Sequence, residues 1–91
     1  MDAYEQLESL LDLAEQLGLK IRRLPGLAGE GDHPGGALTR VKGEEVLFLD
    51  AQAGLADQLS VTAAALAGRP GIEDRYMAPE LREIIDRAGA R

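Results

Sequence analysis

The chain has 91 residues, no cysteine and a formal net charge of −6, from sixteen acidic and ten basic side chains. The length fits a single domain, 1–91. The lack of cysteine excludes disulfides, cysteine-ligated metal sites and thiol catalysis, and the negative charge makes nucleic-acid binding unlikely because it repels phosphate. Aromatic residues are scarce, so small aliphatic side chains must form the core, and we expect a homodimer to supply further buried surface.

The first residues are acidic and amphipathic, whereas a signal peptide begins with basic residues followed by an apolar run. No apolar stretch approaches the roughly 20 residues that a membrane-spanning helix needs. We therefore expect a cytoplasmic protein that makes no membrane contact.

A helix is predicted over 3–17, where leucines recur at helical spacing. Asp2 followed three residues later by Glu5 fits a capping box at its start. Gly18 suits the left-handed position that ends a helix. Residues 19–24 then alternate apolar and basic side chains, as a half-exposed strand does.

The segment 25–36 holds five glycines and two prolines and is predicted to be the longest loop. Two strands, 37–42 and 46–49, follow it and are expected to form a hairpin. Since 46–49 is apolar at every position, we expect it to be the central strand, covered on both faces.

A second helix is predicted over 55–67, with Gln58 among the outward-facing residues and Leu55 in the apolar stripe. A third begins at Pro79, which suits a first helical turn. Residues 72–77 allow a short helical turn, in which Tyr76 is expected to pack. The predicted fold class is α+β, with one three-stranded, mainly antiparallel sheet and three helices in the order α-β-β-β-α-α.

The glycine-rich loop does not match a phosphate-binding motif. Such a motif would need Gly or Ala three residues after Gly31, where Pro34 stands. The loop also leads into a strand, so it lacks the helix N-terminus that gathers backbone N–H groups around phosphate. Nucleotide binding is not expected.

Four residues form the candidate site of the alternative hypothesis, a small enzyme or ligand binder that uses the 25–36 loop: Glu30, Asp32, His33 and Asp50. The first three could ligate a metal, and Asp50 directly follows the apolar strand. However, zinc sites usually draw on several His or Cys residues, and this chain has one histidine. Asp50 equally suits a turn or a cap. No cofactor, metal or catalytic residue is therefore expected.

Between Gly35 and Gly68 the chain has a Gly-Gly pair, a hairpin ending in an apolar strand, and an alanine-rich helix. This order resembles the core of the ImmA/IrrE-type zinc metallopeptidases, whose helix carries a Leu-Ala-His-Glu-Leu-Gly-His pattern. On that resemblance, Ala64 and Gly68 stand where the zinc-binding histidines would be, and Ala65 stands where the catalytic glutamate would be. The resemblance implies a non-catalytic form of that fold, since this helix cannot hold the metal that activates water. As a whole, the chain looks like a short bacterial protein, which implies no function.

The sequence thus favours a non-enzymatic binding or scaffolding domain that forms a homodimer and binds a protein partner. A further hypothesis is a regulatory partner of a nucleic-acid-associated system. It would use four basic residues on one sheet face: Lys20, Arg22, Arg40 and Lys42.

Overall fold

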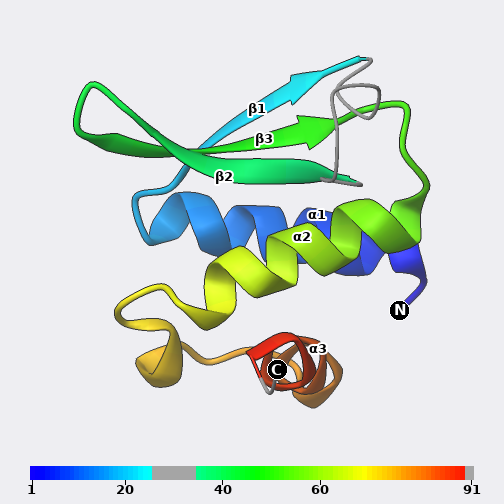
Figure 1. Cartoon of the computed structure of the whole chain (residues 1–91). Helices are drawn as coiled ribbons and strands as arrows, with labels where there is room; N and C mark the ends of the chain where they lie inside the picture. Colours follow the sequence, from blue (N-terminus) through cyan, green and yellow to red (C-terminus); the bar gives the residue numbers. More distant parts are fainter. Residues whose placement is uncertain (26–34, 90–91) are drawn as a thin grey trace.

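The computed structural model describes residues 1–25 and 35–89 (Figure 1). Its elements are α1 (Ala3–Gln16), β1 (Lys20–Leu24), β2 (Gly36–Val41), β3 (Glu44–Asp50), α2 (Leu55–Ala67), the 3₁₀ turn η2 (Ile72–Asp74) and α3 (Pro79–Gly89). The α+β class, the three helices, the three-stranded sheet and their predicted order are confirmed. No helix in the described part of the chain is long and apolar enough to span a membrane.

Both ends of α1 follow from local sequence. The backbone N–H of Glu5 donates to Asp2 Oδ1 at 2.9 Å, and the N–H of Asp2 donates to Glu5 Oε1 at 3.4 Å, which completes the predicted capping box. At the other end Gly18 has a φ of 87°. The N–H of Leu19 then donates to the Ala14 carbonyl at 2.9 Å, closing the helix and directing the chain into β1.

The sheet is mixed. Its strand order is β1-β3-β2, so β3 is the central strand, as predicted. β2 and β3 form an antiparallel hairpin whose two turn residues, Lys42 and Gly43, both have positive φ. β1 pairs with β3 in parallel, so only one of the two pairings is antiparallel. The two edge strands, β1 and β2, therefore run in opposite directions on either side of β3.

All three helices lie on one face of the sheet. Figure 1 shows α1 and α2 directly beneath the strands and α3 beneath those two helices. The core is built mainly from leucines of α1, β3 and α2, with Ile72 and two residues of α3. No described helix or strand covers the other face. The sequence predicted that both faces of β3 would be covered, whereas the described helices cover one of them. Phe48, which points to that other face, is half-buried.

The buried side of α2 differs from the prediction. Gln58 is buried and Leu55 is exposed, whereas the sequence predicted the reverse. The Gln58 side chain bends back and its Nε2 donates to the Ala53 carbonyl at 2.8 Å, so the amide is satisfied inside the fold. Tyr76 is also exposed rather than packed, because it follows η2 in an extended connection to α3.

Arg69, just after α2, connects three elements. Its Nε and Nη2 donate to the Leu17 carbonyl at 3.2 and 3.0 Å, at the end of α1. Its Nη1 pairs with the Glu45 carboxylate of β3 in a part-buried position. One side chain therefore holds the ends of α1 and α2 against the sheet.

Replacing Arg69 with methionine is expected to lower the free energy of unfolding by about 2 kcal/mol, because a part-buried carbonyl and a carboxylate lose their donor. Urea denaturation followed by circular dichroism would measure this loss. Arg75→Met is the matched control, since Arg75 bonds to Gln16 in an exposed position and should cost less than about 0.5 kcal/mol. Equal losses in the two variants would contradict the role given to Arg69.

Candidate functional site

Of the four residues in the predicted candidate site, Asp50 is within the described part of the chain. It ends β3 and is 1% exposed. Its Oδ1 accepts a hydrogen bond from the Gln52 N–H at 2.9 Å, and its own N–H donates to the Gly35 carbonyl at 2.9 Å. Asp50 therefore shapes the turn that leads from β3 towards α2. The other three residues, Glu30, Asp32 and His33, lie outside the described residues.

Among the described residues, no group of three or more His, Asp or Glu side chains could hold a metal ion. On the predicted resemblance, the positions of the zinc-binding histidines are Ala64 of α2 and Gly68, the residue just after it, and both are exposed. They are four residues apart in the sequence, the spacing that lets two side chains on one helix share a metal, but Gly68 lies just beyond the last residue of α2. Ala65 is buried. Neither Ala64 nor Gly68 has a side chain that could ligate a metal.

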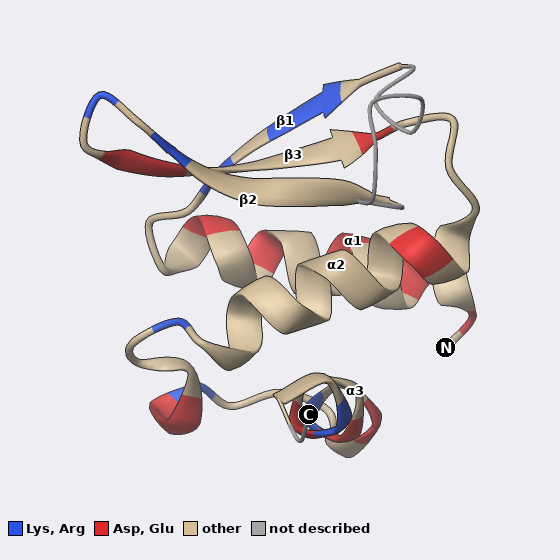
Figure 2. Ribbon diagram, viewed as in Figure 1, with Lys and Arg blue, Asp and Glu red and all other residues tan. Residues whose placement is uncertain are grey.

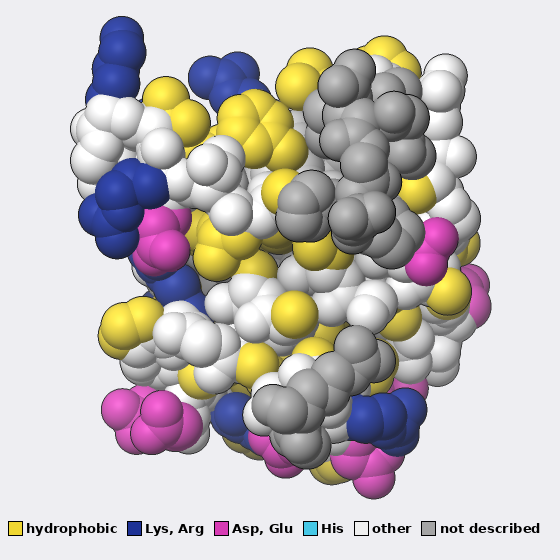
Figure 3. Space-filling model, viewed as in Figure 1, with side chains coloured by type: hydrophobic (Ala, Val, Ile, Leu, Met, Phe, Trp, Pro, Cys, Tyr) yellow, Lys and Arg dark blue, Asp and Glu magenta, His cyan; other side chains and the backbone are white. Residues whose placement is uncertain are grey.

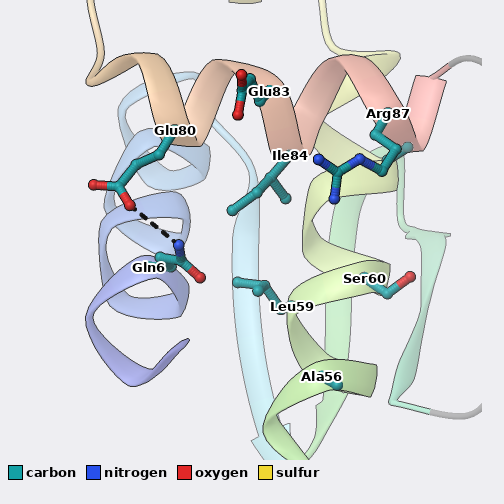
Figure 4. A pocket seen from close by; sticks show the side chains of 9 residues that line it. Gln6, Ala56, Leu59, Ser60, Glu80, Glu83, Ile84 and Arg87 are labelled. Atoms are coloured by element: carbon teal, nitrogen blue, oxygen red, sulfur yellow. Dashed lines mark hydrogen bonds between the residues drawn. The ribbon is translucent and has the colours of Figure 1, made fainter. Parts of the chain in front are cut away.

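A hollow of about 410 Å³ lies where α3 crosses α1 and α2 (Figure 4). Leu59 and Ile84 point towards each other across it. The rim is polar and carries charges of both signs, and Gln6 Nε2 donates to Glu80 Oε2 at 3.4 Å. A rim of mixed charge does not select one class of charged ligand.

Ser60 is the hydroxyl at this hollow, on the same side as Arg87 (Figure 4). A nucleophilic serine needs a base within hydrogen-bonding reach. No hydrogen bond joins Ser60 to a carboxylate in the part of the chain that the structure describes, and the one histidine lies outside it. The described residues around the hollow therefore form no nucleophile–base pair.

The uncovered side of the sheet carries a second hollow, of about 360 Å³. Strand alternation explains its lining, because neighbouring strands place paired residues side by side on one face. The register pairs Lys20 with Val46 and Arg22 with Phe48. Lys42, in the hairpin turn, also lines the hollow.

Figure 3 shows hydrophobic side chains next to Lys and Arg side chains on this side of the sheet, away from the helices. We call this surface the open sheet face. Its lining residues are Lys20, Arg22, Val41, Lys42, Glu44, Val46 and Phe48.

The open sheet face is basic on an acidic chain. Lys20 Nζ lies 2.7 Å from Glu44 Oε2 in an exposed ion pair. Among the described residues, no ion pair is formed by Arg22 or Lys42. Three bases against one acid leave a charge of +2 on the face, whereas the whole chain carries −6. The face therefore favours an anionic partner.

Arg40 does not share this face, contrary to the prediction. Arg40 is opposite Glu45 in the strand register, on the side of the sheet that faces the helices, and its Nη1 donates to the Gly43 carbonyl at 3.4 Å. In a regular strand Lys42, two residues after Arg40, would lie on the same face of the sheet as Arg40. However, it lies in the turn with a φ of 52°, so it leaves the alternation and reaches the open face.

The apolar centre of the open face, Val46 and Phe48, was missed by sequence reasoning. An apolar run looks the same whether one or both faces are covered. The useful signal was in β1, where Lys20 and Arg22 alternate with Ile21 and mark the solvent side of the sheet.

No family model, curated protein or solved structure matches the chain. The resemblance of residues 35–68 to the zinc metallopeptidases stays a prediction.

Proposed function

We propose that the chain is a non-enzymatic, cytoplasmic protein-binding domain that works as a homodimer. Its open sheet face binds a segment of a partner protein that carries both acidic and apolar side chains. The observation behind this proposal is that Phe48 and the exposed Val41 lie among Lys20, Arg22 and Lys42 on a face that no described helix covers.

The two kinds of side chain on this face have different roles. Burial of Phe48 and of Val41, which is 43% exposed, provides the favourable free energy, since removing apolar surface from water drives most association. The basic side chains around them attract an acidic segment and repel a basic one, which sets the partner's charge and speeds the encounter. Together they favour an acidic segment with apolar side chains at intervals.

A nucleic acid is the less favoured anion. Phe48 is the one aromatic side chain on the open face, whereas single-strand binding modules stack successive bases on several. The net charge of −6 also opposes the approach of a long phosphate backbone.

Fluorescence anisotropy with a short labelled peptide of alternating glutamate and leucine would test the proposal. We expect saturable binding, and weaker binding by about tenfold or more in the Arg22→Glu, Lys42→Glu double variant. Each reversed charge removes one attraction of up to about 1 kcal/mol and adds a repulsion. The matched control is Arg75→Glu with Arg87→Glu, which changes the net charge equally but lies on the helical side.

Three results would count against the proposal. A peptide of alternating lysine and leucine could bind as well as the glutamate peptide. The control variant could weaken binding as much as the open-face variant. An oligothymidine strand could bind more tightly than the glutamate peptide, which would favour the nucleic-acid hypothesis instead.

A further inference from the structure

β2 is an edge strand, and no described strand pairs with its outer side. The Asp50 N–H donates to the Gly35 carbonyl, so residues 35, 37, 39 and 41 bond to β3 in the alternating antiparallel pattern. The same pattern directs the N–H and C=O groups of Leu38 and Arg40 away from β3. No described strand bonds to them. Such an edge is a template for a further strand.

The two edges of the sheet differ in protection. β1 carries three basic residues among five, and charged side chains of this kind block edge-to-edge pairing. β2 carries one charged residue, Arg40, and exposes Leu38 and Val41 at 42% and 43%. The β2 edge is therefore the one suited to strand pairing.

The side of the molecule that carries β2 also presents α2, which lies beneath it (Figure 1). Asp57 lies at the end where β2 begins, since a Cβ added to Gly35 would overlap the Asp57 main-chain carbonyl. Further along α2, Val61 is half-buried and Ala64 is exposed. Because these side chains are small and mostly apolar, a second helix could approach this surface of α2 closely.

The charges on this side of one copy of the chain would complement those on the same side of a second copy. Arg40 is the one charged residue of β2, and Asp57 is the one charged residue of α2. Figure 2 shows the basic part of β2 and the acidic part of α2 at opposite ends of this side. Arg40 belongs to the helix-facing side of the sheet, the side on which α2 lies. A twofold rotation therefore brings Arg40 of one copy to the end of this side where Asp57 lies in the other copy.

We infer that two copies of the chain pair antiparallel through β2 across a twofold axis and join their sheets into one. This inference rests on the homodimer in the proposed function and names its interface. With Leu38 opposite Leu38 of the partner subunit, Arg40 lies opposite Gly36 of the partner subunit. Its guanidinium then comes close to Asp57 of the partner subunit, and symmetry forms the same pair again. The complementarity specifies a second copy of this chain as the occupant, rather than an unrelated strand.

Charge exchange tests this interface directly. The dimer dissociation constant would be measured by analytical ultracentrifugation of the full chain. Arg40→Glu and Asp57→Lys are each expected to raise it by about tenfold or more, because each places like charges together twice. An equimolar mixture of these two variants is expected to recover dimers, since only the mixed dimer pairs opposite charges at both places. The matched control, Arg87→Glu on α3, should leave the dissociation constant unchanged.

Leu38→Pro provides a second test that does not use charge. It removes an N–H that points away from β3, so the hairpin should keep its internal hydrogen bonds while the dimer is lost. Circular dichroism would confirm that the variant is folded. If this variant does not fold, the charge-exchange mixture still decides the question.

The outcomes separate the interface from the proposed function. A monomer at every concentration would contradict the homodimer and this interface together, and would leave the β2 edge to a strand of another protein. A dimer that is insensitive to all three β2 and α2 substitutions would keep the homodimer and overturn this interface. Failure of the glutamate peptide to bind the open sheet face would affect neither result.

Discussion

Replacing Gly36 with alanine is expected to lower the free energy of unfolding by about 3 kcal/mol or more, a large share of the stability of a small domain. Gly36 begins β2 with a φ of 144°, which L side chains rarely adopt. A Cβ there would overlap the Phe48 carbonyl group of the neighbouring strand. Because the obstacle is backbone, no side-chain rotation relieves it, and β2 must move away from β3. Chemical denaturation would measure the loss.

Gly43→Ala is the matched control for this prediction. Gly43 also has a positive φ, of 83°, but no atom lies within 4 Å of an added Cβ. The control isolates the conformational cost of a positive φ, which is about 1 kcal/mol. If the two variants lost equal stability, the close approach of β2 to Phe48 would not be the cause.

Replacing Leu47 with alanine is expected to cost about 3 kcal/mol, because Leu47 is fully buried on the central strand and the change leaves a cavity in the core. Leu38, its cross-strand partner on β2, is 42% exposed. Leu38→Ala should therefore cost less than about 0.5 kcal/mol. Thermal and urea denaturation would be compared for the two variants.

The comparison must be made at a protein concentration low enough for the monomer to dominate, because Leu38 belongs to the proposed dimer interface. A stability loss for Leu38→Ala that grows with protein concentration would support that interface. A loss as large as that of Leu47→Ala in the monomer would show instead that Leu38 is part of the core, against the burial described above.

Local signals predicted most of the elements. The pair Asp2 and Glu5 marked the start of α1, and Gly18 marked its end, because capping depends on residues within one helical turn. The bounds of α2 agree with the prediction at both ends. Its buried face does not, because periodicity alone did not show that Gln58 could satisfy its amide on the Ala53 carbonyl inside the fold.

The candidate site was less predictable than the fold. Asp50 was singled out as a carboxylate that follows a buried strand, and it is buried at that position with a backbone partner at Gln52. The apolar run of β3 carried no information about which of its faces the helices cover. The open sheet face therefore could not be located from Val46 and Phe48 alone.

The sequence by itself determined the fold class, the order of the elements and the central place of β3, because helical and strand periodicity, turn residues and caps act over short distances. Only the tertiary structure decided that β1 lies parallel to β3, that all three helices cover one face, and that Lys42 joins the open sheet face while Arg40 does not. These features depend on how distant segments pack and on a two-residue turn that breaks strand alternation, and neither is expressed in the pattern of any one segment.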